Sequence, residues 1–142
     1  MSIAAILQAK GAQVHAVPCG TPVRAAADLL SRHRIGAMPV LDGDTVAGIL
    51  SERDIVHCLA TEGAAILDAP VEQAMTAPVI TITRQTEVLS ALSLITQRRV
   101  RHLPVVEGGL LIGIVSIGDL VKFRMDQIER EAAAMLNYIQ MA

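Results

Sequence analysis

Two short segments of this sequence repeat the same polar residues at the same spacing: Gly48-Ile-Leu-Ser51-Glu-Arg-Asp54 and Gly113-Ile-Val-Ser116-Ile-Gly-Asp119. Each places a serine at the expected start of a helix and an aspartate three residues later. The free N–H groups and positive potential of a helix start suit a phosphate, and the serine hydroxyl adds a donor. An ionised aspartate offers two acceptor oxygens to the paired hydroxyls of a ribose. The pattern therefore predicts contact with a phosphorylated ribose compound.

The same spacing also has an interpretation that needs no ligand. A serine before a helix accepts a hydrogen bond from the helix backbone, and an acidic residue three positions later complements the helix dipole. We call Ser51 with Asp54 the first Ser–Asp pair and Ser116 with Asp119 the second; capping and ligand contact can coexist in both. The glycine that opens each segment would let a ligand approach the backbone closely.

No other group of residues has the spacing of a catalytic or metal site. A Walker loop, a G-x-G-x-x-G motif and a nucleophile elbow do not occur in the sequence. The histidines and cysteines lack metal-ligand spacing; they are His15, His33, His57, His102, Cys19 and Cys58. We therefore expect no catalytic residue, no catalytic cofactor and no metal, and we expect reduced cysteines.

Both segments belong to a longer internal repeat. Shifting the sequence by 65 positions aligns residues 14–60 with residues 79–125 without a gap, and 14 of the 47 positions are identical. Twelve of the other 33 positions exchange one apolar residue for another. The match indicates two copies of one structural unit of about 60 residues.

Each copy predicts a strand, a helix, a hairpin of two strands and a second helix. Apolar residues recur at helical spacing in the helices, and glycine-containing turns suit a tight hairpin. The order β-α-β-β-α, twice, predicts an α+β fold in which the two copies pack sheet to sheet around one core. The strands are expected at 14–17, 38–41 and 46–50 and at 79–82, 103–106 and 110–115, with helices starting near Thr21, Ser51, Thr86 and Ser116.

Two helices are expected outside the repeat. The segment from Ser2 to Lys10 forms a short helix that ends at Gly11. The last helix runs from Asp119 towards Tyr138 with one apolar stripe, which we expect to pack on a second copy of the chain. The expected divisions are residues 1–13 (N-terminal helix and lead-in), 14–60 (first repeat), 61–78 (linker), 79–125 (second repeat) and 126–142 (extended C-terminal helix).

Composition excludes several classes of protein. The 142 residues carry a formal net charge of −2, with no basic block and only one Phe and one Tyr, which argues against nucleic-acid binding. The uncharged stretch 108–118 is shorter than the roughly 20 residues that span a bilayer. The first positive side chain is Lys10, so we expect no signal peptide, no membrane partner and a cytoplasmic location.

The two segments, together with the strands that precede them, resemble tandem CBS domains. Pro39-Val-Leu-Asp42 precedes the Gly48 segment, and Arg101-His-Leu-Pro104-Val-Val-Glu107 precedes the Gly113 segment. The resemblance to such a pair, a Bateman module, covers nearly the whole chain and is strongest with small stand-alone bacterial CBS-pair proteins. It implies a pseudo-two-fold pair with two clefts between the repeats. It also implies adenosine ligands: AMP, ADP, ATP, S-adenosylmethionine or, in some members, NAD(H).

The resemblance further implies which residues share a cleft. A cleft in the family combines the Ser and Asp of one copy with the strand before the proline of the other. The first Ser–Asp pair would then face Arg101 and His102, which supply cations for phosphates. Arg53 either points to those phosphates or lies on a solvated helix face.

Further residues follow from the same resemblance. Thr81 and Thr83 would reach the base or ribose in the first cleft. The second cleft would be apolar, with little to hold charge, and would combine Ser116, Asp119, Ala37 and Met38.

The sequence thus predicts a non-catalytic sensor that binds an adenosine nucleotide and changes its contacts with a partner protein or with itself. We expect a homodimer formed through the domain helices and the C-terminal helix. The alternative is a ligand-independent interaction or scaffold module, in which each serine and aspartate only caps a helix.

Overall fold

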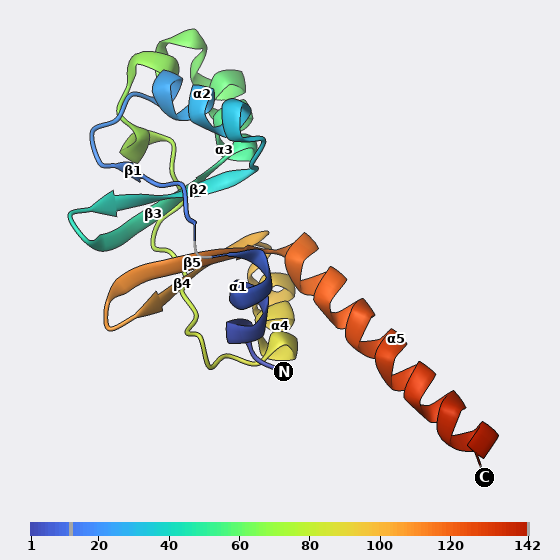
Figure 1. The fold of residues 1–142 in the computed structure, drawn as a ribbon. Helices are drawn as coiled ribbons and strands as arrows, with labels where there is room; N and C mark the ends of the chain where they lie inside the picture. Colours follow the sequence, from blue (N-terminus) through green and yellow to red (C-terminus); the bar gives the residue numbers. More distant parts are fainter. Residues whose placement is uncertain (12, 142) are drawn as a thin grey trace.

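The computed structural model describes residues 1–11 and 13–141, and it consists of two halves that repeat one order of elements (Figure 1). The first half contains β1 (Val17–Pro18), α2 (Val23–His33), β2 (Ala37–Asp42), β3 (Thr45–Ser51) and α3 (Glu52–Glu62). The second half contains α4 (Val88–Arg98), β4 (His102–Glu107), β5 (Leu110–Ser116) and α5 (Ile117–Met141), and the N-terminal helix α1 (Ile3–Lys10) joins it. Two 3-10 turns, η1 (Ala64–Asp68) and η2 (Val71–Gln73), lie in the linker.

The two hairpins confirm the predicted repeat. Strands β2 and β3 pair antiparallel from Ala37–Ser51 to Asp42–Thr45, and β4 and β5 pair in the same register from His102–Ser116 to Glu107–Leu110. Each hairpin also has a register shift at the same repeat position, after Val40 and after Val105. The α+β class and the two-repeat architecture are therefore as the sequence predicts.

The strands that were predicted to open each repeat are much shorter than expected. In the first repeat only Val17 and Pro18 pair with β2, instead of residues 14–17. In the second repeat the predicted strand 79–82 is reduced to one bridge between Ile82 and Val105. The chain turns immediately afterwards, since the Thr86 N–H donates to the Thr83 carbonyl and the Thr86 hydroxyl accepts from the Thr83 N–H. That turn limits pairing beyond Ile82.

The apolar interior consists of two clusters rather than one sheet-to-sheet core. The first lies between β1–β3 and helices α2 and α3, and the second lies among β4, β5, α1, α4 and α5. Segments outside the repeats complete both clusters. Ile3 and Ile6 of α1 are buried in the second, and Ile66, Val71 and Ala74 of the linker are buried in the first. The sheets still contact each other through β3 and β5.

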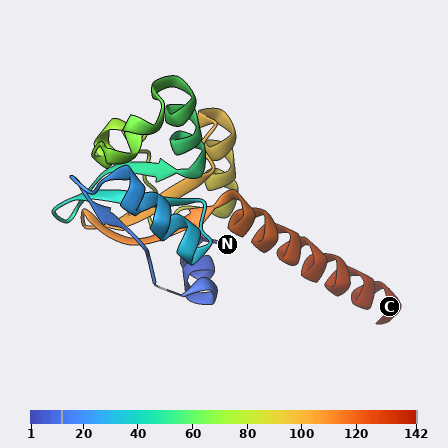
Figure 2. The same cartoon turned by 90° about the horizontal axis from the view of Figure 1, so that it is seen from above.

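Helix α5 is longer than predicted and projects away from both halves (Figures 1 and 2). Its 25 residues correspond to about 37 Å at 1.5 Å per residue. Only its first turns contact the domain, where Leu120 is fully buried. Beyond them, the large apolar side chains Met125, Ile128, Met135, Leu136 and Ile139 are 47–63% exposed.

Candidate functional site

Each Ser–Asp pair forms a complete cap at the start of a helix. In the first, the Asp54 N–H donates to Ser51 Oγ at 3.1 Å and the Ser51 N–H donates to Asp54 Oδ2 at 2.9 Å. Ser116 and Asp119 form the same two bonds at the same distances. This reciprocal arrangement satisfies two N–H groups that a helix start leaves without an internal partner. The capping interpretation therefore holds for both pairs.

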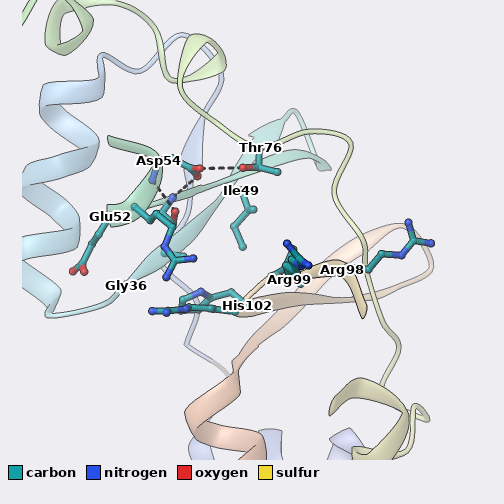
Figure 3. Close-up of a pocket in the computed structure, with 13 residues that line it drawn as sticks. Gly36, Ile49, Glu52, Asp54, Thr76, Arg98, Arg99 and His102 are labelled. Carbon is teal, nitrogen blue, oxygen red and sulfur yellow. Dashed lines mark hydrogen bonds between the residues drawn. The ribbon is translucent and has the colours of Figure 1, made fainter. Parts of the chain in front are cut away.

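A pocket of about 340 Å³ lies between the two repeats, beside the first Ser–Asp pair. One wall comes from the first repeat and the linker, and the other comes from the end of α4 and the start of β4. Figure 3 shows Asp54 and Thr76 on one side, opposite Arg99 and His102 on the other. The lining residues are Gly36, Ala37, Ile49, Ser51, Glu52, Arg53, Asp54, Thr76 and the run from Arg98 to His102.

The structure thus brings together, from both repeats, most but not all of the residues that the sequence analysis assigned to the first cleft. Ser51, Asp54, Arg101 and His102 all line this pocket, and so does Arg53. Whether they bind a ligand stays a prediction, but their placement across the repeat boundary is a property of the structure.

Two further arginines that the sequence analysis did not select also line the pocket. Arg98 and Arg99 end α4, and Arg99 adopts a left-handed conformation with φ of 54° that turns the chain into β4. This turn keeps the arginine-rich run beside the pocket. The cluster Arg98-Arg99-Val-Arg101 in the sequence was the available signal. With Arg53, four arginine residues line the pocket, together with the acidic residues Glu52 and Asp54.

His102 is half-buried and lines the pocket beside these charged residues. Burial lowers the pKa of His102 below its ordinary value, and the positive charges of Lys10 and Arg101 lower the pKa further. The carboxylates of Asp119 and Glu52 oppose this effect without cancelling it. The imidazole is therefore neutral at pH 7, and it can donate from one nitrogen and accept at the other.

Thr81 and Thr83 are not among the residues that line the pocket. Both side chains are exposed, and the Thr83 hydroxyl lies 3.4 Å from the Thr86 hydroxyl, within the turn that ends the shortened strand. Thr76 lines the pocket instead, and its hydroxyl donates to Asp54 Oδ1 at 3.1 Å (Figure 3). Thr76 reaches this position because it pairs with Ile49 of β3.

Whether the residues assigned to the second cleft share a binding site stays a prediction. Ala37 lines the first pocket, and Met38 is fully buried in the first apolar cluster. Asp119 instead pairs with Lys10 of α1, whose Nζ lies 2.7 Å from Asp119 Oδ2. Burial alone would raise the pKa of Asp119, but the hydrogen bonds from Lys10 and from Ser116 outweigh burial and lower the pKa below its ordinary value.

Gly48 and Gly113, which open the two repeated segments, each pack against a neighbouring segment of the chain. A Cβ at Gly48 would lie 2.6 Å from Met75 Sδ, and a Cβ at Gly113 would lie 2.6 Å from Leu7 Cδ2. At Gly48 a Cβ would also lie 2.8 Å from the Thr76 carbonyl oxygen, so the close packing of the linker requires glycine there, whereas at Gly113 it would meet only the end of the Leu7 side chain.

Within residues 1–11 and 13–141, no three His, Cys, Asp or Glu side chains lie close enough together to hold a metal ion. Over the same residues, no helix combines the length and apolar character needed to cross a membrane. Cys58 is buried, and burial raises the pKa of its thiol, with Glu62 and Asp54 adding to the effect.

Comparison with known proteins identifies the family to which this sequence is similar. The sequence pattern of the CBS domain matches residues 11–61 and 71–126. The mitochondrial CBS domain-containing protein CBSX3 of Arabidopsis thaliana is 34% identical over 116 residues, which cover 78% of this chain and 56% of that protein. The chain thus spans little more than half of that relative.

Two solved structures are similar over most of their length. A CBS-domain protein of Agrobacterium tumefaciens has 39% identity and a TM-score of 0.83, covering 87% of this chain and 99% of that one. A CBS-domain protein of Pyrobaculum aerophilum, solved in complex with AMP, has 26% identity and a TM-score of 0.74, covering 84% of this chain and 89% of that one.

Proposed function

The chain belongs to the CBS-domain family, with two CBS domains in tandem, and we propose that it is a regulatory module that binds an adenosine nucleotide in the pocket between them. One observation carries the proposal. The capped start of α3, with Ser51 and Asp54, and the cationic residues Arg101 and His102 line the same pocket from different repeats. The AMP complex of the Pyrobaculum aerophilum protein, a structural relative, supports a ligand of this class.

The chemistry of the two walls matches the parts of such a ligand. Asp54 accepts one hydrogen bond at each carboxylate oxygen, from Ser51 and from Thr76. Each oxygen therefore retains capacity for a ribose hydroxyl. Arg101 and its neighbours offer donors to a phosphate. Ile49, Ala37 and Val100 give the pocket an apolar surface against which an adenine ring can pack.

The ligand is AMP, ADP, ATP or NAD(H), and its role is regulatory rather than catalytic. A nucleotide bound to Asp54 and to Arg101 bridges the two repeats, so it favours the relative orientation in which both contacts form. It shifts the equilibrium only by its difference in affinity for the two arrangements. The consequence is a change in contacts with an effector protein or with a second copy. A cytoplasmic location remains a prediction of the sequence.

The C-terminal helix supports a homodimer as the form on which the nucleotide acts. The spacing between its apolar residues alternates between four and three positions, which is typical of the seam of a two-stranded coiled coil. Arg124 and Glu129 flank that seam five residues apart, so a parallel partner would place opposite charges side by side. The seam consists of Val121, Met125, Ile128, Ala132, Met135 and Ile139.

The direct test is the occupancy of the purified protein. The native chain is isolated without added nucleotide, denatured and analysed by mass spectrometry for released small molecules, and calorimetric titration with AMP follows. We expect an adenosine compound in the released fraction and saturable binding of AMP. A protein that releases no adenosine compound and does not bind AMP would overturn the proposal.

A second candidate is a ligand-independent interaction module. The observation that favours it is that residues of the chain complete both Ser–Asp caps by themselves. In that case the serine and aspartate only stabilise helix starts, and Asp54→Ala would reduce stability without any nucleotide effect. The occupancy test separates the two candidates, since only the nucleotide-binding module retains an adenosine compound.

A further inference from the structure

The two Ser–Asp pairs have different internal hydrogen-bond partners. At the first pair, Thr76 makes two hydrogen bonds. Its N–H donates to the Ile49 carbonyl at 2.8 Å, and its hydroxyl donates to Asp54 Oδ1 at 3.1 Å. Ile49 and Asp54 have exact counterparts in the second repeat, 65 residues later. Those counterparts, Ile114 and Asp119, also accept hydrogen bonds, but from a residue of different chemistry.

At the second pair, one lysine makes both contacts. The Nζ of Lys10 donates to the Ile114 carbonyl at 2.9 Å and to Asp119 Oδ2 at 2.7 Å. A single ammonium group therefore replaces the N–H and the hydroxyl of a threonine. The replacement changes the charge, because the hydroxyl leaves Asp54 with its full negative charge whereas the ammonium neutralises Asp119.

Helix α1 holds Lys10 at this position. Ile3 and Ile6 of α1 are buried in the second apolar cluster, and the Ile3 N–H donates to the Thr86 carbonyl at 2.9 Å. Leu7 packs directly onto Gly113, where a Cβ would lie 2.6 Å from its Cδ2. Lys10 therefore reaches Asp119 from a helix that is packed against the second repeat.

This contact opposes ligand binding at the second pair. A ribose hydroxyl is a neutral donor, and its hydrogen bond to a carboxylate is weaker than that of an ammonium group. Lys10 and the Ser116 N–H both donate to Asp119 Oδ2, so a ribose hydroxyl is left with Oδ1 of a carboxylate whose negative charge the ammonium already offsets. At the first pair no charged donor contacts the carboxylate, and the Thr76 hydroxyl leaves acceptor capacity on both oxygens of Asp54.

We propose that Lys10 acts as an internal ligand of the second Ser–Asp pair and thereby limits each chain to one bound adenosine nucleotide. The inference rests on the proposed function. It makes Lys10 a residue that sets the stoichiometry of binding, through a contact between positions 109 residues apart in the sequence.

The test uses the full chain and AMP as the probe. Lys10→Met removes the ammonium and keeps much of the aliphatic side chain, and Lys122→Met is a matched control because Lys10 and Lys122 are the only lysines of the sequence. Equilibrium dialysis should give one AMP per chain for the parent and for Lys122→Met. Lys10→Met should gain a second AMP, bound about tenfold more tightly than the parent binds any second AMP. Adding Asp119→Ala to Lys10→Met should abolish that gain.

Each other result has a defined meaning. A parent chain that binds two AMP equally, or a Lys10→Met variant that still binds one, overturns the inference and leaves the proposed function intact. A chain that binds no AMP in any variant overturns the proposed function and this inference with it. The carboxyl pKa of Asp119, measured by carbon-13 NMR without ligand, should rise in Lys10→Met, and an unchanged value would show that Lys10 does not hold Asp119.

Discussion

The imidazole of His102 in the second repeat lies against the backbone of Gly36 in the first repeat. A Cβ on residue 36 would lie 3.4 Å from Cε1 of the ring, which is ordinary contact distance. The Gly36 carbonyl accepts a hydrogen bond of 2.9 Å from the N–H of Glu52, the first residue of α3. His102 is therefore in contact with the backbone that positions the first Ser–Asp pair, and its protonation bears on how the two repeats fit together.

The stability of the protein should depend on pH through His102. Because burial lowers the pKa of His102 in the folded chain, the unfolded chain binds a proton more readily in the range between the two pKa values. The free energy of unfolding should fall as pH drops below about 6.5 and should level off below the folded-state pKa. Urea unfolding at about pH 7.5 and pH 5.5 measures the effect. His102→Gln should remove it, whereas His57→Gln, on the exposed side of α3, should not.

Asp54→Ala should weaken AMP binding by tenfold or more, corresponding to about 1.5–3 kcal/mol for a charged acceptor. Asp119→Ala should leave AMP affinity unchanged, because Asp119 does not line the pocket. Each variant loses the carboxylate half of its capping box and keeps the serine half, so both should lose about 0.5–1.5 kcal/mol of stability. Calorimetric titration and thermal unfolding of the two variants separate the effects. Equal losses of affinity would contradict the proposed site.

Arg101→Ala should reduce the affinity for AMP more than the affinity for adenosine. The guanidinium is proposed to bind phosphate, which adenosine lacks, and the loss for AMP should be about tenfold. Parallel titrations with AMP and adenosine give the ratio. If both ligands lose affinity by the same factor, Arg101 contacts the base or supports the start of β4 instead.

Truncation after Arg124 should weaken the proposed homodimer. Burying a large aliphatic side chain contributes about 1.5–3 kcal/mol, and the truncation removes several such side chains from the seam of α5. Light scattering at micromolar concentration should show a dimer for the full chain and a weaker dimer or a monomer for the truncated chain. Ile128→Asp on the seam should act in the same direction, and Ala133→Asp off the seam should not. A monomeric full chain would refute the dimer.

The regular elements could be predicted from sequence because their signals are local. The hairpin between β4 and β5 follows from two apolar runs around Gly108 and Gly109, both of which adopt the positive φ that the turn requires. The cap at Ser51 follows from the spacing of two polar residues. The meeting of this cap with Arg101 and His102 in one pocket followed from the family resemblance.

The contacts that could not be predicted join distant segments without a local pattern. Thr83 was assigned to the first cleft by the family resemblance, but the chain turns directly after Ile82 and the Thr83 hydroxyl lies beside that of Thr86. Thr76 and Lys10 reach the two aspartates through a bridge to β3 and through the docking of α1. Neither residue has a neighbour in sequence that marks it, so only the three-dimensional arrangement identifies them.

The two apolar clusters differ in how far apart their members lie along the chain. The first draws on residues 17–75, a contiguous stretch, whereas the second joins residues 3–7 to residues 80–123. During synthesis, the first cluster can therefore close before the second repeat exists, while α1 must wait for the last strand and helix. Closing that long loop carries the larger entropic cost. We expect α1 to be the element that completes folding, and removal of residues 1–11 to leave the first repeat structured while the second loses part of its interior.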